Sequence, residues 1–233
     1  MTRREALTTI GKAAVGAGVV AAVAAAGPAM YLIASRSAAP FAASGPPQSS
    51  STTVEPGFIS LFDGETLDGW EQAGPGGFTV VDGNLQSNGG MGLLWYTKQE
   101  FADFVLKCDW KEAHFTDNSG VFVRFPNPLG DPWNAVNEGY EIQIDNVGAP
   151  NGNPIYQTGA VFNFAAPSEV ASNPVGEWNY YEIRAVGQQY TVILNGVDVT
   201  NFTGSRSTVG YVGLQNHDDT STISFRNIRI MEL

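Results

Sequence analysis

The sequence has one cysteine, Cys108, and only two histidines, His114 and His217. A single cysteine cannot form a disulfide within the chain, so the fold must be held by its apolar core. Cys108 alternates with apolar residues within the run 104–110. This pattern predicts a small core residue on a strand and not a catalytic thiol.

Positive charge is also scarce. The chain has 12 Lys and Arg residues against 23 Asp and Glu residues, which gives a net charge of −11. Such an acidic chain repels nucleic acid and anionic membrane surfaces, so neither is an expected partner. Membrane contact is expected only through the N-terminal segment, if that segment is not removed.

The N-terminal segment has the composition of an export signal. Arg3 and Arg4 precede a run rich in Ala, Gly and Val from Ala13 to about Ala34. Paired arginines before a weakly hydrophobic run indicate the twin-arginine pathway. The alternative is an uncleaved anchor, since the run could span a bilayer. We expect a secreted, periplasmic or cell-surface protein with residues 1–39 as its signal segment, or a membrane-anchored one if that segment is not cleaved.

Two further regions follow the signal segment. Residues 40–56 are rich in Pro, Ser and Ala and are predicted to be a flexible linker. Residues 57–233 are long enough for one β domain with a sizeable core.

Sustained helical periodicity is missing after residue 57, where short alternating runs are separated by turn residues. Asp82-Gly83 and Asn195-Gly196 each predict a two-residue hairpin. The pattern predicts an all-β fold without helices, a two-sheet antiparallel jelly-roll sandwich. Segments 126–137, which contains Trp133, and 146–157 are predicted to be loops that form walls of a binding site. The predicted strands are 78–81, 84–86, 93–96, 104–113, 120–125, 140–145, 159–164, 178–185, 190–194, 197–200, 210–215 and 222–231.

Residues 140–145 carry the clearest candidate site. Successive strand residues point to opposite faces, so Glu141, Gln143 and Asp145 share one face. Two carboxylates and an amide in a row on a rigid strand suit a polyol such as a sugar.

Two other segments can add polar groups to that face. In residues 118–124, alternation places Phe122 and Arg124 opposite the two valines, and Asn118 precedes them. In residues 213–217, Gln215 and His217 share a face. Arg124 could instead neutralise a strand carboxylate, and His217 could cap a loop.

Seven blocks resemble the 3-keto-disaccharide hydrolase family and occur in the family's order. They are GFISLFDGETLDGW at 57–70, NSG at 118–120, YEIQID at 140–145, GEWN at 176–179, LNG at 194–196, GLQNH at 213–217 and FRNIRI at 225–230. The resemblance implies a concanavalin-like jelly roll that acts on oxidised glycosides. It matches Glu141 and Asp145 to the family's acidic strand and His217 to its Leu-Gln-x-His block. The family usually continues that block with Gly, whereas this chain has Asp218.

The chemistry implied by the resemblance differs from ordinary glycoside hydrolysis. A ketone at C3 of a sugar acidifies the C2 proton, so a base can start an elimination that expels the C1 substituent, and water then adds. Conventional retaining glycosidases need carboxyl groups about 5–5.5 Å apart. Glu141 and Asp145 are about 13 Å apart along a strand, which argues against such a pair.

Candidate roles follow from the residue types. His217 or Glu141 is the predicted base, Asp145 an acid or a metal ligand, and Arg124 and Gln143 substrate clamps. Gln215, Asn118 and Trp133 are further predicted substrate contacts. A divalent metal ion could polarise the C3 oxygen, because Glu, Asp and His are competent ligands.

Two other functions remain open on the sequence alone. A carbohydrate-binding module could use the same polar face, with Trp133 and Tyr156 as stacking surfaces. A structural envelope protein tethered by residues 13–34 would neither bind nor cleave a sugar.

Overall fold

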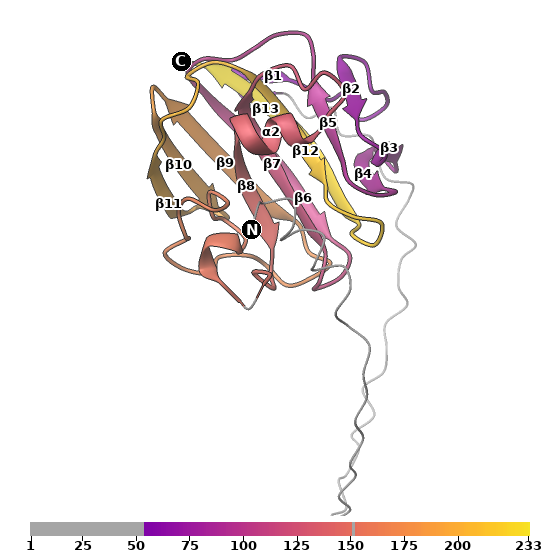
Figure 1. Cartoon of the computed structure of the whole chain (residues 1–233). Coiled ribbons are helices and arrows are strands. Elements are labelled where there is room, and N and C mark those ends of the chain that lie inside the picture. Colours follow the sequence, from indigo (N-terminus) through magenta and orange to yellow (C-terminus); the bar gives the residue numbers. More distant parts are fainter. Residues whose placement is uncertain (1–53, 151) are drawn as a thin grey trace, which may run out of the picture. The chain divides into compact units, whose positions relative to one another are not determined.

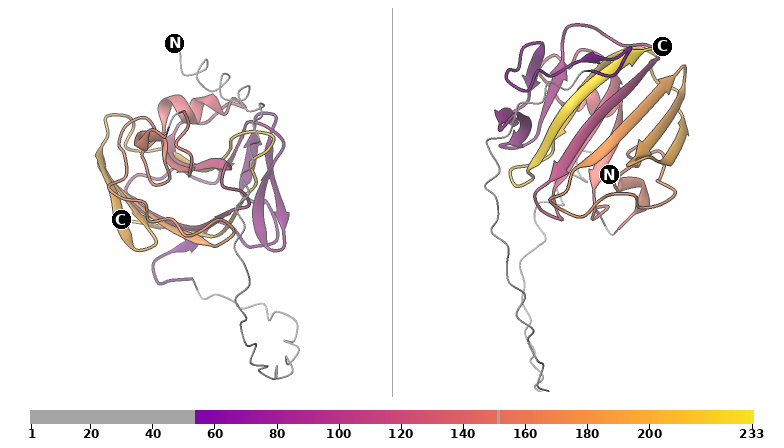
Figure 2. Two further views of the ribbon diagram at one scale, coloured as in Figure 1. Left: turned by 90° about the horizontal axis from the view of Figure 1, so that it is seen from below. Right: turned by 180° about the vertical axis from the view of Figure 1, so that it is seen from behind.

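The computed structural model describes residues 54–150 and 152–233. The predicted signal segment and most of the predicted linker lie outside the described residues. The described part consists of two antiparallel β-sheets packed face to face (Figures 1 and 2). No helix within it is long and apolar enough to cross a membrane.

The larger sheet has eight strands. In spatial order it contains β11 (Val197–Thr203), β10 (Gln189–Leu194), β9 (Asn179–Val186), β6 (Phe104–Glu112), β13 (Ile223–Glu232), β4 (Asn84–Asn88) and β3 (Gly77–Val81), and β1 (Ile59–Ser60) pairs with β13. The smaller sheet has five strands. Their order is β2 (Trp70–Ala73), β5 (Gly92–Tyr96), β12 (Tyr211–Asn216), β7 (Asn118–Phe125) and β8 (Tyr140–Asp145). The predicted two-sheet sandwich is confirmed.

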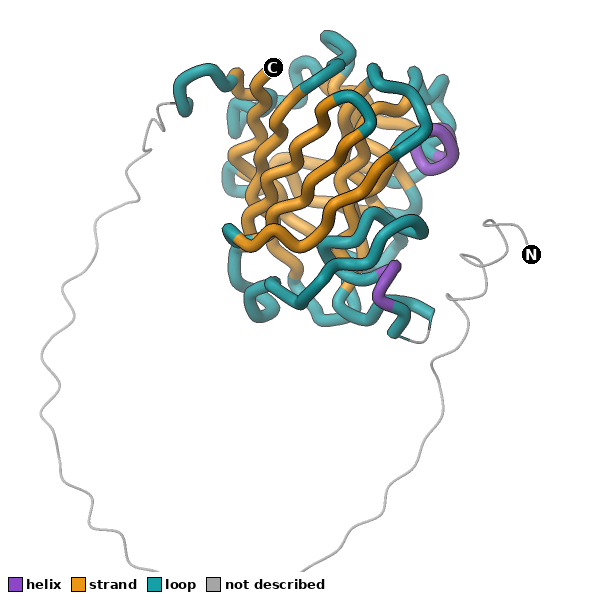
Figure 3. Tube along the Cα trace, turned by 90° about the vertical axis from the view of Figure 1, so that its left-hand side faces the viewer, coloured by secondary structure: helices purple, strands orange, loops and turns teal. Residues whose placement is uncertain are grey.

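The two predicted hairpins form as expected. Asp82 and Gly83 join β3 to β4 with φ of 50° and 76°, and Asn195 and Gly196 join β10 to β11 with φ of 51° and 85°. These are the left-handed conformations that match the twist of a two-residue hairpin. Loops and turns gather at the ends of the strands (Figure 3).

The main core lies between the two sheets. Along β8, Tyr140, Ile142 and Ile144 belong to this core, which also contains Cys108 at 1% exposure. Burial raises the pKa of the Cys108 thiol well above its usual range, so the thiol stays protonated as the sequence suggests. Because the apolar side of β8 is used in the core, its polar side faces away from the larger sheet.

A second apolar cluster covers part of that outer face. It joins side chains of the smaller sheet to the helix α2 (Trp133–Glu138), which lies over this sheet (Figure 1). The cluster contains Ala73, Leu93, Trp95, Phe122, Phe125, Ala135 and Val136. It leaves the part of the face nearer Asp145 to polar side chains.

Two predictions about local structure were wrong. The segment expected to be an irregular loop contains α2, which begins after Pro132 and buries Ala135 and Val136, and η1 (Pro154–Tyr156) is a short 3-10 helix. Both are too short to show a helical period. Residues 159–164 are not a strand and make only isolated bridges through Val161.

Candidate functional site

The outer face of the smaller sheet carries three parallel rows of side chains. Strands β7 and β8 pair residue by residue, and residues directly opposite share a face. The outward pairs form three rows that run across the strands. The first row contains Phe122 and Glu141, the middle row Gly120 and Gln143, and the third row Asn118 and Asp145. The strand predicted to carry the site therefore does lie beside the segment that contains Asn118.

Strand β12 extends the rows on the other side of β7. Gly213 is opposite Phe122. Continuing that antiparallel register places Gln215 opposite Gly120 and His217 opposite Asn118. Glu141, Gln143, Asp145, Asn118, Gln215 and His217 thus come together on one face.

Glu141 bends over Gly120. A Cβ added to Gly120 would lie 2.7 Å from both Cγ and Oε1 of Glu141. Only glycine leaves room for this side chain, which is 5% exposed. The bend brings the carboxylate from the first row toward the middle row. The carboxylate of Glu141 is then separated from the Cα atom of His217 by one strand spacing across the sheet and two residues along the strand. This separation corresponds to about 8 Å.

Two buried amide oxygens lie in the middle row. Oε1 of Gln143 and Oε1 of Gln215 have no hydrogen-bond partner in the described part of the chain. Nε2 of Gln143 donates to Oδ1 of Asn118 at 3.3 Å. Buried polar groups are normally paired, so two open acceptors on either side of Gly120 indicate hydrogen-bonding capacity that a ligand could use.

Asp145 has a different environment from Glu141. Its carboxylate accepts hydrogen bonds from the backbone N–H groups of Val147, Gly148 and Ala149 at 2.7–3.1 Å, and from Asn118 at 3.2 Å. Burial raises the pKa of Asp145, and these backbone bonds and the charge of nearby His217 oppose the rise. Asp145 therefore organises the loop that follows β8 and lies close enough to interact with His217.

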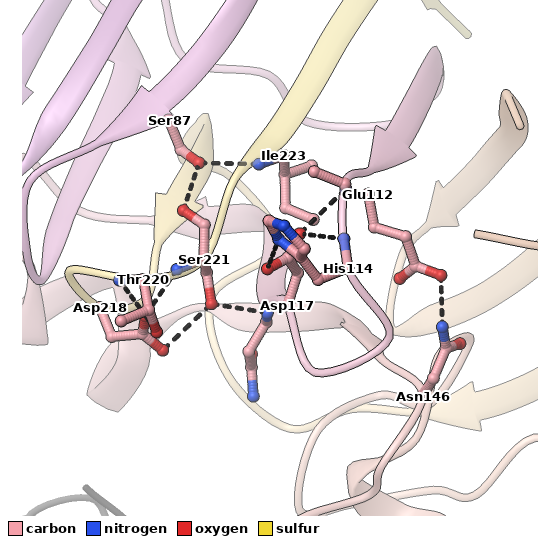
Figure 4. A network of polar contacts seen from close by, with 11 residues as sticks. Ser87, Glu112, His114, Asp117, Asn146, Asp218, Thr220, Ser221 and Ile223 are labelled. Carbon is pink, nitrogen blue, oxygen red and sulfur yellow. Dashed lines mark hydrogen bonds and ion pairs between the residues drawn. The ribbon is translucent and has the colours of Figure 1, made fainter. Parts of the chain in front are cut away.

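His217 is held by its neighbour in the sequence. Its Nδ1 lies 2.8 Å from Oδ2 of Asp218, and its side chain keeps 16% exposure. Asp218 also accepts hydrogen bonds from Thr220 and Ser221, which belong to the network shown in Figure 4. The residue that departs from the family pattern thus contacts the candidate base directly.

An aromatic pair borders the first row. The backbone N–H of Phe162 donates to the carbonyl of Glu141, and the preceding Val161 points into the core. Phe162 therefore faces the same side as Glu141. Its ring centroid lies 5.0 Å from that of Tyr156. Both residues are partly exposed, so the pair offers an apolar surface beside the carboxylate.

The segment that contains Phe162 also covers the outer edge of β8. Backbone hydrogen bonds join Glu141, Gln143 and Asp145 to residues 158–162 at 2.9–3.0 Å. The edge strand that carries the acidic side chains therefore has its backbone groups occupied along its length.

Arg124 does not lie on this face, which corrects the sequence prediction. Its φ of 54° and the shift in register between Tyr211 and Val212 mark a β-bulge, and the extra residue reverses the alternation. The guanidinium is fully buried, and donates to the carbonyls of Ala102 and Ala185 and to Asp103. Arg124 thus fastens the two sheets together and cannot clamp a substrate on the outer face.

Trp133 is the first residue of α2 and not part of an irregular loop. It is partly buried and packs against the second apolar cluster, which includes Phe122. Phe122 in turn lies opposite Glu141. Trp133 therefore packs beneath the first row as part of the second apolar cluster, and the predicted role of Trp133 as a substrate contact stays a prediction.

Sequence reasoning missed three contributors to the site. Gly120 has no predicted role beyond its NSG motif, although its missing side chain makes room for Glu141. Phe162 lies in a predicted strand without a role, and Asp218 is predicted only to differ from the family pattern. The alternation of residues 160–162 against 140–145 carried a signal for Phe162. The contact between Asp218 and His217 depends on a turn whose form the sequence does not reveal.

The described residues do not assemble a metal site from acidic, histidine or cysteine side chains. No group of three or more such side chains in residues 54–150 and 152–233 could hold an ion. Asp145, the predicted metal ligand, is occupied by the backbone of its own loop.

Comparison with known proteins identifies relatives over this same region. The family described as the 3-keto-alpha-glucoside-1,2-lyase-like domain matches residues 57–231. A protein of Bacteroides thetaiotaomicron named 3-keto-disaccharide hydrolase is 25% identical over 234 aligned residues, which cover 76% of this chain and 79% of that protein.

Solved structures give the same picture of the fold. Two crystal structures of candidate glycosyl hydrolases from Parabacteroides distasonis are 29% and 25% identical, with TM-scores of 0.64 and 0.65. Each covers 76% of this chain, and the chain covers 99% and 94% of them. The carbohydrate-binding module CBM66 from Bacillus subtilis, at 16% identity and a TM-score of 0.53, covers 70% of this chain and is itself covered to 96%. That last likeness concerns the fold alone.

Proposed function

This chain belongs to the 3-keto-alpha-glucoside-1,2-lyase-like family, and we propose that it cleaves glycosides whose sugar ring carries a ketone at C3. The family and the relatives support a carbohydrate-active, hydrolase-like protein. One observation carries the finer proposal. Glu141 and His217 border a row in which Gln143 and Gln215 present buried, unpaired oxygens. Both oxygens are shielded from solvent, so the two amide groups must turn toward a bound sugar for its hydroxyl groups to donate to them.

The reaction proceeds by elimination followed by hydration. His217 removes the proton from C2, and the electrons of the C–H bond form an enolate stabilised by the C3 ketone. The enolate expels the oxygen substituent at C1, which takes a proton from Glu141. Water then adds to C1 of the enone and gives a proton to Glu141, while His217 returns its proton to C2. Both side chains end in their starting states, and the net reaction is hydrolysis.

The arrangement suits two separate proton-transfer groups better than a displacement pair. Glu141 lies between Phe122 and Phe162 in the first row, and its side chain is 5% exposed. Asp145, the other acid of the strand, has both oxygens occupied by hydrogen bonds. It is therefore not the second carboxylate of a conventional glycosidase.

The substrate can be placed by its two chemical surfaces. The partly exposed rings of Tyr156 and Phe162 suit the C–H face of a sugar, and Gln143 and Gln215 suit its hydroxyl groups. The C1–C2 bond would then lie beside the carboxylate of Glu141, which occupies the space above Gly120.

The test uses a 3-keto-glucoside and the matching non-oxidised glucoside. We expect turnover of the first only, and a loss of about 10²- to 10⁴-fold in kcat for Glu141→Gln and His217→Ala. The matched control is Asp219→Asn, which changes an exposed acid near His217. In D2O, Glu141→Gln should still exchange the C2 proton, because the base is intact, whereas His217→Ala should not. The proposal would be contradicted by undiminished turnover in both Glu141→Gln and His217→Ala. It would also be contradicted if the unaltered protein bound the 3-keto-glucoside without turning it over.

We also propose export through the twin-arginine pathway, on the basis of Arg3, Arg4 and the run that follows them. Residues 1–56 fused to a folded reporter should direct it out of the cytoplasm. Replacement of both arginines by lysine should retain it inside, and unchanged export would contradict the proposal. Fractionation of the exported fusion separates a cleaved signal from an anchor.

A further inference from the structure

We infer that Asp218 is a positioning residue for His217: its carboxylate holds the imidazole with the hydrogen on Nδ1 and leaves the lone pair of Nε2 to take the C2 proton. The inference rests on the proposed function, in which His217 is the base. It adds a residue that directly follows the block 213–217 and that the proposed function leaves without a role.

The two oxygens of Asp218 have different hydrogen-bond partners. Oδ2 accepts from Nδ1 of His217 at 2.8 Å and from the hydroxyl of Ser221 at 3.1 Å. Oδ1 accepts from the backbone N–H groups of Thr220 and Ser221 at 2.8 and 2.7 Å, and from the hydroxyl of Thr220 at 2.8 Å. One oxygen therefore shapes the turn, and the other faces the histidine.

The surroundings of Asp218 favour its charged form. Partial burial disfavours the charged form, but the hydrogen bonds from His217, Thr220 and Ser221 outweigh it and hold the pKa of Asp218 well below its usual range. A carboxylate accepts hydrogen bonds and cannot donate them. A neutral imidazole beside it must therefore carry its hydrogen on the nitrogen that faces Asp218.

The turn that carries Asp218 is anchored to two other strands. The hydroxyl of Ser221 accepts the backbone N–H of Asn118, in β7, at 2.9 Å. Ser87, in β4, donates its hydroxyl to the carbonyl of Ser221 at 3.2 Å and accepts the N–H of Ile223 at 2.9 Å (Figure 4). The carboxylate is thus held in place from both sheets before any substrate arrives, and the orientation of His217 is set in advance.

The consequence for the reaction is a fixed direction of proton transfer. In the first step the C2–H bond breaks and an Nε2–H bond forms, while the Nδ1–H bond is kept. The resulting imidazolium lies against the carboxylate of Asp218, and the charge of nearby Asp145 also attracts it. An imidazole with the opposite tautomer would present N–H to the substrate and could not act as a base.

The division between the two oxygens allows a sharp test. In Asp218→Asn, the amide oxygen can keep the three bonds of Oδ1, and the NH₂ group replaces Oδ2. That group donates to Nδ1 of His217 and forces the hydrogen onto Nε2. Asp219→Asn is the matched control, because Asp219 is the next acid in the same turn and is exposed. ¹⁵N NMR of the histidine side chains reports the tautomer directly, with His114→Ala to assign the two signals.

We expect the unaltered protein and Asp219→Asn to show the Nδ1–H tautomer at alkaline pH, and Asp218→Asn to show the Nε2–H tautomer. On the 3-keto-glucoside, kcat of Asp218→Asn should fall about 10²- to 10⁴-fold with KM little changed. An Nε2–H tautomer in the unaltered protein would overturn the inference without any variant. Equal kcat for the two Asn variants, with His217→Ala inactive, would overturn it as well. Full activity of His217→Ala would instead overturn the proposed function, while the NMR result still decides the role of Asp218.

Discussion

Replacing Glu112 with glutamine should stabilise the protein in a manner that depends on pH. Glu112 ends β6 and is 1% exposed. Its Oε1 accepts a hydrogen bond from Asn146, the residue after Asp145, and its Oε2 has no partner in the described part of the chain. Burial raises the pKa of Glu112 to about 7. The bond from Asn146 opposes this rise, and the charges of Asp117 and Asp145 add to it.

The direction of the pH effect on stability depends on whether the native or the unfolded state binds the proton of Glu112 more tightly. Between pH 4.5, the ordinary pKa, and about 7, the native protein keeps a proton on Glu112 that the unfolded chain has lost. The protonated carboxyl of Glu112 therefore makes its whole contribution to stability below pH 4.5, and this contribution is lost as the pH rises to about 7. The loss above both values is about 3 kcal/mol in the free energy of unfolding. Glutamine stays neutral and avoids the loss.

The assay is urea unfolding of the unaltered protein and Glu112→Gln from about pH 4.5 to about pH 8. The difference in unfolding free energy should change by about 3 kcal/mol in favour of the variant as pH rises. A constant offset from the new NH₂ group is allowed, since only the change with pH is diagnostic. Glu169→Gln, at an exposed position, should show no such change. A difference between the Glu112→Gln and unaltered proteins that stays flat with pH would refute the reasoning.

Three further predictions concern the site and its support. Gly120→Ala should lower kcat by at least about 10-fold with a near-native melting temperature, because its Cβ displaces the carboxylate of Glu141; unchanged kcat would contradict the assigned geometry. Phe162→Ala should raise KM for the 3-keto-glucoside by about 3- to 10-fold with a smaller effect on kcat, measured by steady-state kinetics, and an unchanged KM would remove the aromatic surface from the site. Arg124→Met should lower the free energy of unfolding by about 3 kcal/mol in urea, because it removes the hydrogen bonds to the carbonyl groups of Ala102 and Ala185, with kcat per folded molecule unchanged; a selective loss of kcat would restore Arg124 to the site.

Most of the fold could be predicted from local pattern. Alternation located eleven of the strands, and Asp82-Gly83 and Asn195-Gly196 marked two hairpins correctly. The short strands β1 and β2 were missed, because two to four residues carry too little alternation to be recognised. Helix α2 was missed for a similar reason, since its stability comes from burying Ala135 and Val136 against the sheet.

The candidate site was predictable where side chains follow strand alternation and not where the backbone departs from it. Glu141, Gln143 and Asp145 share a face as expected. Arg124 does not join them, because a bulge inserts one residue into β7 and turns the guanidinium into the space between the sheets. Asp218 could not be assigned, because its contact with His217 is made by the shape of a turn.

The covered edge of β8 bears on how the protein behaves at high concentration. A strand at the margin of a sheet can recruit a strand from another molecule through its unpaired backbone groups. Here the segment 158–162 already takes those groups on Glu141, Gln143 and Asp145. The polar strand can therefore stand at the margin without becoming a template for aggregation. A change that loosened this segment would expose the edge, and the first consequence would be chain-to-chain association before any loss of the fold.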